Sequence, residues 1–358
     1  MTAQARSFSK PLESPVRPVV SSLAVATATA LVLAGCSGSS DNTSGVAQGQ
    51  DGFEETVDQA QELGTDAEPG EFPRTVRNYV ANEEIGETEI PAKPERVIVL
   101  DGGELDNVVA LGIEPVGVAH PAGAEAVPSY LDAGDPVDLG AYDALDLEQI
   151  NNLEPDLILG STLRIDDDGL KEQLQEIAPT VLSARPGLVW KENFLLNAAA
   201  LGEEEQAQEQ LDAYEERAAR IGEDIAEANG GEMPTVSMLR FMAGMNRLYA
   251  NGSFIGTILA DVGLPRTETE DIEDLAVEVS AEEITMAEGE WLFWGTYGDP
   301  ETTVQAEVVD GPLWDEVPAV AAGRVAEIDD ETWYLGLGVS AAEEVLDDLE
   351  RYSDEFSS

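Results

Sequence analysis

The segment EEEQAQEQLDAYEERAARIGEDIAEAN (residues 203–229) predicts one long amphipathic helix. Its apolar residues recur at alternating spacings of four and three, so they lie on one stripe of a helix. That stripe consists of Ala207, Leu211, Tyr214, Ala218, Ile221, Ile225 and Ala228. At 1.5 Å per residue such a helix is about 40 Å long. The following NGGEMP (229–234) places glycine at the C-cap and proline beyond it, which predicts the end of the helix.

Strand and helix signals alternate on both sides of this helix. The apolar runs that predict buried strands are RVIVLD (96–101), EPVGVA (114–119), DLILG (156–160), TVLSA (180–184), TVSML (235–239), EWLFWG (290–295) and RVAEI (324–328). Strands that alternate with helices predict parallel sheets covered by helices. We therefore expect an α/β fold with two Rossmann-like lobes, each built on a central, mostly parallel sheet. The long helix would join the lobes and leave a ligand cleft between them.

The same signals predict the domain organisation. We expect an N-terminal α/β lobe at 74–187, a connecting helical segment at 188–232 and a C-terminal α/β lobe at 233–358. Residues 36–73 are rich in Gly, Ser, Asp, Glu and Gln and contain few apolar residues, which is typical of a flexible tether. Residues 1–35 are predicted to be a lipoprotein signal peptide.

The signal peptide is predicted from a positively charged leader before the apolar run Val19–Ala34. This run is too short and too weakly hydrophobic for a membrane span. It ends in LAGC (33–36), which resembles the bacterial lipobox, whose cysteine is diacylated. Cys36 is the only cysteine in 358 residues, so it forms no internal disulfide. We expect a lipid anchor at Cys36 on the outer face of the cell membrane; the alternative is an ordinary signal peptide that contains a cysteine by chance.

The composition is strongly acidic, with 73 Asp and Glu against 18 Lys and Arg and a formal net charge of −55. Such a charge argues against nucleic acid or an anionic membrane surface as a partner, because both would repel it. The acids are spread over every segment, which is typical of adaptation to salty or alkaline surroundings. The hydrophobic fraction of 43% indicates a folded body rather than a disordered chain.

Four segments carry a family resemblance that spans about residues 90–352. They are PERVIVLDGGELDNVVALGIEPVGV (94–118), LEQINNLEPDLILGS (147–161), SFIGTILADVGLPR (253–266) and WYLGLGVSAAEEVLDDL (333–349). In their order, and with the lipobox, they resemble the substrate-binding proteins of ABC importers, of the class with a single helical connector. That class includes iron-siderophore, haem and cobalamin binding lipoproteins. The resemblance implies a monomer that captures its ligand without catalysis and delivers it to an ABC permease dimer with its ATPase.

Two glutamates share one local frame, in DLEQI (146–150) and SAEEI (280–284). In the family that the chain resembles, one glutamate on each lobe pairs with arginines of the permease. Glu148 and Glu282 match these positions, so the resemblance implies that they dock the protein on its permease.

A purely structural interpretation of the same frame is complete in itself. Asp146 and Ser280 are expected to cap helices, while Gln149 and Glu283 would complete capping boxes. Glutamates in the first turn also suit the positive end of a helix dipole.

Arginines stand out on so acidic a chain as candidate ligand contacts. Arg164 and Arg185 follow predicted strands of the first lobe, whereas Arg240, Arg247 and Tyr249 surround the strand that opens the second. The carboxyl ends of parallel strands form the expected edge of the cleft. Guanidinium groups can donate paired hydrogen bonds to hydroxamate, catecholate or carboxylate oxygens. The alternative for each arginine is a local salt bridge with the abundant acids.

Aromatic residues provide a second set of candidate contacts, because planar or apolar chelates require aromatic walls. These candidates are Trp190, Trp294, Tyr297, Trp333 and Tyr334. Their alternative is packing in the core.

The choice of ligand depends on what the chain lacks as well as on what it has. Its single histidine, His120, cannot build the sites of several imidazoles and carboxylates that zinc and manganese importers use. The chain has neither a G-x-S-x-G motif nor a phosphate-binding loop, so no enzyme is predicted. The arginine set favours a ferric siderophore, with the iron held by the chelator and no other cofactor. Cobalamin, haem and a non-transport adhesive lipoprotein remain alternatives.

Overall fold

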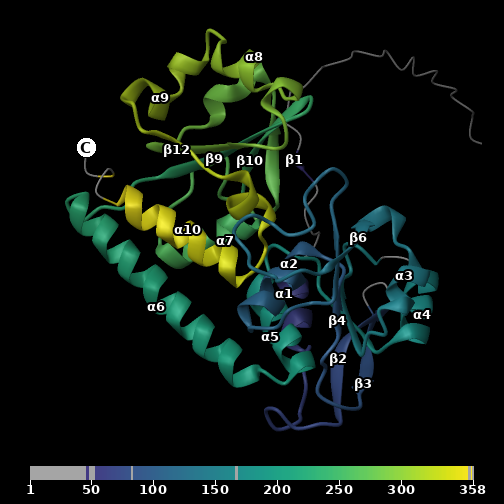
Figure 1. Cartoon of the computed structure of the whole chain (residues 1–358). Helices are drawn as coiled ribbons and strands as arrows, with labels where there is room; N and C mark the ends of the chain where they lie inside the picture. The colour runs from purple at the N-terminus through teal and green to yellow at the C-terminus, as the bar shows by residue number, and fades with distance from the viewer. Residues whose placement is uncertain (1–45, 48–52, 82–83, 166–167, 354–355, 357–358) are drawn as a thin grey trace, which may run out of the picture. The chain divides into compact units, whose positions relative to one another are not determined.

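The computed structural model describes residues 46–47, 53–81, 84–165, 168–353 and 356. The described residues belong to one compact unit. The predicted signal peptide, and Cys36 with it, lies outside the described residues. Within the described part, the predicted alternation of strands and helices and the two-lobed α/β fold are confirmed (Figure 1).

The N-terminal lobe contains a five-stranded parallel sheet with the strand order β6-β5-β4-β7-β8. Its strands are β4 (Val97–Val99), β5 (Gly117–His120), β6 (Val137–Ala141), β7 (Leu157–Ser161) and β8 (Thr180–Ser183). The helices between them are α2 (Gly102–Ala110), α3 (Leu147–Asn152) and α4 (Asp168–Ile177). Val97 and Val99 face one core cluster and Ile98 faces another. Burial on both faces explains why these strands are continuously apolar.

The folded body begins earlier than the sequence predicts. A hairpin of β2 (Arg74–Ala81) and β3 (Glu84–Ile90) precedes the sheet. Helix α1 (Phe53–Gln61) lies in the segment predicted to be a tether. Val57 and Ala60 are three residues apart on this helix and pack against the core of the N-terminal lobe. So few apolar residues make a weak sequence signal, and only packing identifies the helix.

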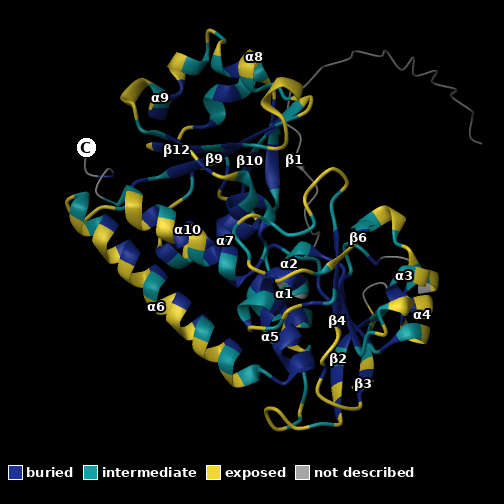
Figure 2. Cartoon of the chain, viewed as in Figure 1, coloured by how far each residue is buried: buried dark blue, intermediate teal, exposed yellow. Residues whose placement is uncertain are grey.

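The connecting segment consists of two helices, α5 (Trp190–Leu201) and α6 (Glu204–Ala228). The long helix predicted at 203–229 is confirmed as α6, and nearly its whole apolar stripe is buried. Figure 2 shows the exposed residues of α6 on the side that faces away from the other helices. Gly222 lets α6 approach the C-terminal lobe closely, because a Cβ there would lie 2.0 Å from the carbonyl oxygen of Val262.

The C-terminal lobe contains a mixed sheet with the strand order β1-β11-β10-β9-β12-β13. Its strands are β1 (Val46–Ala47), β9 (Val236–Met242), β10 (Met245–Tyr249), β11 (Ala276–Val279), β12 (Trp291–Thr296) and β13 (Val325–Glu327). Strands β9, β12 and β13 are parallel, whereas β10 and β11 are antiparallel additions. A two-residue turn with Gly244 in the left-handed region (φ 77°) reverses the chain between β9 and β10. This hairpin makes the sheet mixed.

Helices cover both faces of this second sheet. They are α7 (Phe254–Val262), α8 (Gln305–Val309), α9 (Pro318–Ala322) and α10 (Val339–Tyr352), with a 3₁₀ helix at Ala281–Met286 and a π-helical turn at Glu331–Leu335. One core cluster includes residues of both sheets and of helices α5, α6 and α10. Helix α10 packs on both α6 and α2 (Figure 1). The two lobes therefore share a continuous apolar core beside the connector.

Candidate functional site

The carboxyl edge of the N-terminal sheet carries an ion pair whose carboxylate is buried. Asp101 follows β4, is only 1% exposed and caps helix α2 by accepting a hydrogen bond from the Gly102 N–H at 2.7 Å. The hydroxyl of Ser161, at the end of β7, donates to the same carboxylate. Nε of Arg164 lies 3.4 Å from Oδ2 of Asp101. Arg164 is therefore paired with a carboxylate that the fold itself holds in place.

A second arginine lies at the same edge without such a partner. The guanidinium carbon of Arg164 lies 4.3 Å from the ring centre of Tyr142, which follows β6. Arg185 follows β8 and is half-buried; burial, together with the positive charge of Arg164, lowers its pKa. Among the described residues, no carboxylate lies within ion-pair distance of Arg185. The N-terminal edge therefore presents one paired and one unpaired arginine.

A buried acid, Glu104, lies close to Asp101 and Ser183 at this edge. Glu104 on α2 is 1% exposed, and one of its carboxyl oxygens accepts a hydrogen bond from the Ser183 hydroxyl. Burial raises the pKa of Glu104 to about 8, and the nearby negative charge of Asp101 adds to that effect. Glu104 is therefore largely protonated at neutral pH and contributes little negative charge to the edge.

The C-terminal lobe holds its arginine much more tightly. Arg240 lies on β9 and its side chain is 5% exposed. Its guanidinium makes a bidentate pair with Asp330, with Nε 2.6 Å from Oδ1 and Nη2 2.5 Å from Oδ2. Nη1 donates to the Tyr249 hydroxyl at 3.0 Å. Burial opposes the positive charge, but the hydrogen bonds to Asp330 outweigh it and raise the pKa of Arg240.

Three tyrosine rings surround the same guanidinium. The carbon of the Arg240 guanidinium lies 4.6 Å from the ring centre of Tyr297, 5.0 Å from that of Tyr334 and 5.9 Å from that of Tyr249. Tyr297 is 41% exposed, whereas Tyr249 and Tyr334 are buried. An arginine in such an aromatic setting gains cation–π stabilisation, and Tyr297 offers a free face to a ligand.

Strand alternation explains which predicted residues join Arg240. Arg240 and Arg247 are paired across β9 and β10, so they lie on the same face of the sheet. Arg247 is paired with Glu278 on β11, with Nη2 3.0 Å from Oε1. Trp294 on β12 lies on the opposite face, where its ring packs edge-on against Phe241.

The other two predicted tryptophans are packed in the core. Trp190 and Trp333 are both 0% exposed. The indole N–H of Trp190 donates to Thr257 at 2.9 Å, and that of Trp333 donates to Asp348 at 2.8 Å. Ligand contact by these two residues stays a prediction, and their packing favours the alternative of a structural role.

The two edges meet at a glycine pair in α2. A Cβ at Gly103 would lie 3.1 Å from the carbonyl oxygen of Leu337, and one at Gly102 would lie 3.9 Å from that of Leu335. The same Cβ at Gly102 would lie 3.7 Å from the Tyr142 hydroxyl. Glycine therefore lets the segment after Tyr334 approach the N-terminal edge, which brings the surroundings of Arg240 and Arg164 to one junction.

Direct hydrogen bonds join the lobes beside this junction. Asp106 on α2 accepts the backbone N–H groups of Ser340 and Ala341, at 2.7 and 2.9 Å, and so caps α10. It also accepts a hydrogen bond from the Tyr130 hydroxyl at 3.1 Å. Burial raises the pKa of Asp106 to about 6, although these hydrogen bonds oppose the rise. The Asp106 carboxylate thereby links the N-terminal lobe to helix α10 by hydrogen bonds.

We call these surroundings the junction site. It consists of Tyr142, Arg164, Arg185, Arg240, Arg247, Tyr249, Tyr297, Asp330 and Tyr334. Asp330 and Tyr142 were not singled out from the sequence as site residues, whereas Tyr334 was one of the aromatic candidates. Asp330 lies three residues beyond β13 and Tyr142 directly follows β6, so their positions at carboxyl strand ends are the signal that could have found them.

The two glutamates expected to dock a permease are exposed at helix starts. Asp146 caps α3, and a full capping box forms where Glu283 accepts the N–H of Ser280. At α3 the box predicted with Gln149 is not formed, since that side chain donates instead to the carbonyl oxygen of Asp138 at 3.1 Å. The caps leave both glutamate side chains directed to solvent.

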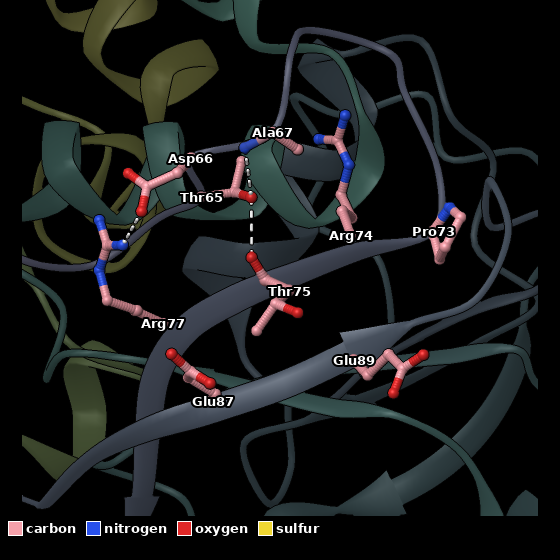
Figure 3. Close-up of a pocket in the computed structure, with 9 residues that line it drawn as sticks. All are labelled: Thr65, Asp66, Ala67, Pro73, Arg74, Thr75, Arg77, Glu87 and Glu89. Atoms are coloured by element: carbon pink, nitrogen blue, oxygen red, sulfur yellow. Dashed lines mark hydrogen bonds and ion pairs between the residues drawn. The ribbon is translucent and has the colours of Figure 1, made fainter.

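Two cavities lie away from the junction site. One, of about 250 Å³, lies between the β2–β3 hairpin and residues 65–67 (Figure 3). There Arg77 pairs with Asp66 at 2.8 Å. The other, of about 310 Å³, is lined by α2, α6 and α10. Neither cavity contains a predicted ligand contact.

His120 lies at the end of β5, where one ring nitrogen is 3.0 Å from a carboxylate oxygen of Asp138 on β6. Over the described ranges, no group of three His, Cys, Asp or Glu side chains is placed to hold a metal ion. None of the helices within those ranges is both long and apolar enough to cross a membrane.

The chain is similar to several characterised binding proteins. It is 29% identical over 293 residues to a probable siderophore-binding lipoprotein, YfiY, of Bacillus subtilis, covering 78% of this chain and 87% of that protein. It is 27% identical to the Fe(3+) dicitrate-binding periplasmic protein FecB of Escherichia coli, covering 74% and 87%. Among solved structures, SirA of Staphylococcus aureus complexed with staphyloferrin B has a TM-score of 0.68 at 28% identity, covering 78% of this chain and 98% of that one.

A model of the periplasmic binding protein family matches residues 97–332, which include both sheets' parallel strands, the connecting helices and most of the junction site. This chain therefore belongs to the periplasmic binding protein family.

Proposed function

We propose that this protein is the extracytoplasmic substrate-binding component of an ABC importer and that it captures a ferric siderophore at the junction site. The observation that carries this proposal is that each lobe presents arginines, Arg164 and Arg185 on the first and Arg240 on the second, with tyrosine rings beside Arg164 and Arg240. The close approach of residues 335–337 to the glycine pair in α2 supports their assignment to one site. Guanidinium groups donate in pairs to the oxygen atoms of an iron chelate, and tyrosine faces pack on its ligand planes. The names of the relatives, which bind siderophores or ferric citrate, support the same ligand class.

The proposed mechanism is capture without chemistry. The chelator holds the iron, which is cargo, so the protein supplies hydrogen bonds, aromatic contact and shape but no metal ligand. The shared core of the lobes and the Asp106 bonds to α10 restrict relative motion, so binding requires little closure. Such a preformed site loses little conformational entropy when it binds.

Delivery is the second part of the proposal. Glu148 and Glu282 are exposed, one on each lobe, and each follows a capped helix start. We propose that they pair with arginines of the two permease subunits and that a lipid on Cys36 holds the protein at the membrane.

The ligand is tested by tryptophan fluorescence of residues 53–358, titrated with ferric hydroxamate, catecholate and citrate complexes and with haem and cobalamin. Saturable quenching at sub-micromolar concentration by a ferric complex, and not by its iron-free chelator, is expected. Quenching by cobalamin or haem alone would replace the siderophore with that ligand. No response to any of them would contradict the binding proposal.

Docking is tested separately from binding. Reversing both glutamates (Glu148→Arg with Glu282→Arg) should abolish cellular uptake of the ferric complex and leave its Kd unchanged, because neither residue belongs to the junction site. The matched control reverses Glu154 and Glu288, which lie near the same helices. Normal uptake by the first variant would contradict the docking role.

A further inference from the structure

The charges of the junction site are largely cancelled within the protein, and this restricts the ligands that it can take. Arg240 is neutralised by the bidentate pair with Asp330. Arg164 is paired with the buried Asp101. Arg247 is paired with Glu278.

Arg185 is the exception. No carboxylate of the described residues pairs with it, and the buried Glu104, which interacts with Ser183 two residues before Arg185, is held in its neutral form by burial. Four arginines therefore leave the equivalent of one positive charge for a ligand. Counting arginines alone would overstate the attraction for an anion.

The rest of the molecule opposes anions as well. The formal net charge is −55, so the potential around the protein repels a negative ligand at low ionic strength. Salt screens this long-range effect, with a Debye length of about 8 Å at physiological ionic strength. The Arg240–Asp330 pair is screened much less, because both of its side chains are largely buried, whereas the Arg247–Glu278 pair is more exposed.

Iron chelates differ strongly in charge. Three hydroxamate groups cancel the charge of Fe(III) and give a neutral complex, whereas three catecholates give a complex with three negative charges. A trianion in the junction site would meet only one uncompensated cation, which is too little charge to offset the loss of its hydration. A neutral chelate loses less hydration and still accepts hydrogen bonds at its polarised oxygen atoms from the guanidinium N–H groups that remain.

Building on the proposed function, we propose that the junction site selects ferric complexes of low net charge, of the tris-hydroxamate or mixed hydroxamate–carboxylate class, and discriminates against tris-catecholates. Asp330 is the main specificity-determining residue in this proposal, because it neutralises Arg240, the most buried arginine of the junction site. Without the Asp330 carboxylate, the positive charge of Arg240 would be uncompensated among its tyrosine rings. The site would then strongly favour an anionic ligand.

The test uses two synthetic chelators on one tripodal scaffold, one with three hydroxamates and one with three catecholates, both loaded with Fe(III). Fluorescence titration of the natural protein should give at least about a hundredfold tighter Kd for the hydroxamate complex, in 0.15 M and in 1 M NaCl. Asp330→Asn should reduce this preference by about tenfold, the effect of one close charge. Glu278→Gln should shift it in the same direction but less, because that pair is more exposed.

The matched control is Asp347→Asn, which removes a carboxylate paired with Arg217 on α6 and lies outside the junction site. It should leave the preference unchanged. Thermal denaturation verifies that each variant is folded, and Glu278→Gln keeps the test decisive if Asp330→Asn unfolds.

Three outcomes would overturn the inference. Tighter binding of the catecholate complex by the natural protein would overturn the inference alone. The inference alone would also be overturned if the preference for the hydroxamate complex disappeared in 1 M NaCl, because repulsion from the acidic protein surface would then explain that preference. Absence of saturable binding of either complex, and of every other ferric complex, would overturn the proposed function together with the inference.

Discussion

The arginines of the two lobes are held in opposite ways. In the C-terminal lobe, Arg240 is buried, receives a bidentate carboxylate and is surrounded by three tyrosines. In the N-terminal lobe, Arg185 is half-buried, has no carboxylate partner among the described residues, and lies near the like charge of Arg164. The first arginine is therefore mainly an anchor that keeps few N–H groups for a ligand, whereas the second has its whole guanidinium available to one. Residue type and strand position alone do not distinguish these two roles.

The largest effect should come from breaking the buried pair. Arg240→Ala leaves the largely buried Asp330 without its partner, which should lower the free energy of unfolding by about 3 kcal/mol and weaken ligand binding. Denaturant unfolding and fluorescence titration measure the two effects. The exposed Arg220→Ala serves as the control and should change stability by less than about 0.5 kcal/mol. A double variant that also removes the Asp330 carboxylate should recover much of the loss; no recovery would contradict the anchoring role.

Glu104, the buried acid at the N-terminal edge, should make stability depend on pH, and this effect should be of intermediate size. Burial raises the pKa of Glu104 from 4.5 to about 8 in the folded protein. Stability from this group is therefore complete below about pH 4.5 and is lost as the pH rises through 8. Glu104→Gln, which cannot ionise, should melt near the natural protein at pH 5 and at least about 3 °C higher at pH 9. Parallel melting curves across this range would contradict a buried, protonated Glu104.

The unpaired arginine should affect binding without affecting stability. Arg185→Gln should weaken binding of a ferric complex by about tenfold, which corresponds to 1.4 kcal/mol. Its melting temperature should be unchanged or slightly higher, because the substitution relieves repulsion from Arg164. Titration and thermal denaturation of one preparation test both statements. A lower melting temperature with unchanged affinity would make Arg185 an anchor like Arg240 and remove the contrast between the lobes.

The smallest effect should distinguish the exposed tyrosine from the buried tryptophans. Tyr297→Ala should weaken binding about threefold, the value of one aromatic contact, and leave stability nearly unchanged because the ring is exposed. Trp333→Phe should lower stability and leave affinity unchanged, since its indole lies in the core. Weaker binding by Trp333→Phe, with unchanged binding by Tyr297→Ala, would instead identify Trp333 as the ligand contact.

Much of the fold could be predicted because it depends on local patterns. The apolar stripe identified α6 within two residues of its ends, and seven strands were found as short apolar runs. Strands β6 and β11 were missed. Capping at Asp146 and Ser280 also follows from neighbouring residues. Helix α1 and the reversal at Gly244 were missed, because a few apolar residues or one glycine carry too little signal without their packing partners.

By itself, the sequence determined the fold class, the order of the elements, the acidic surface and the candidate arginines at carboxyl strand ends. Only the tertiary structure decided which of these arginines are neutralised. Arg240 and Asp330 are 90 residues apart in the chain, and Arg164 meets Asp101 only because β4 and β7 are neighbours in the sheet. The face of a strand likewise decides that Tyr297 meets Arg240 while Trp294 does not. Ion pairing and side-chain direction depend on distances between elements, and no local pattern encodes those distances.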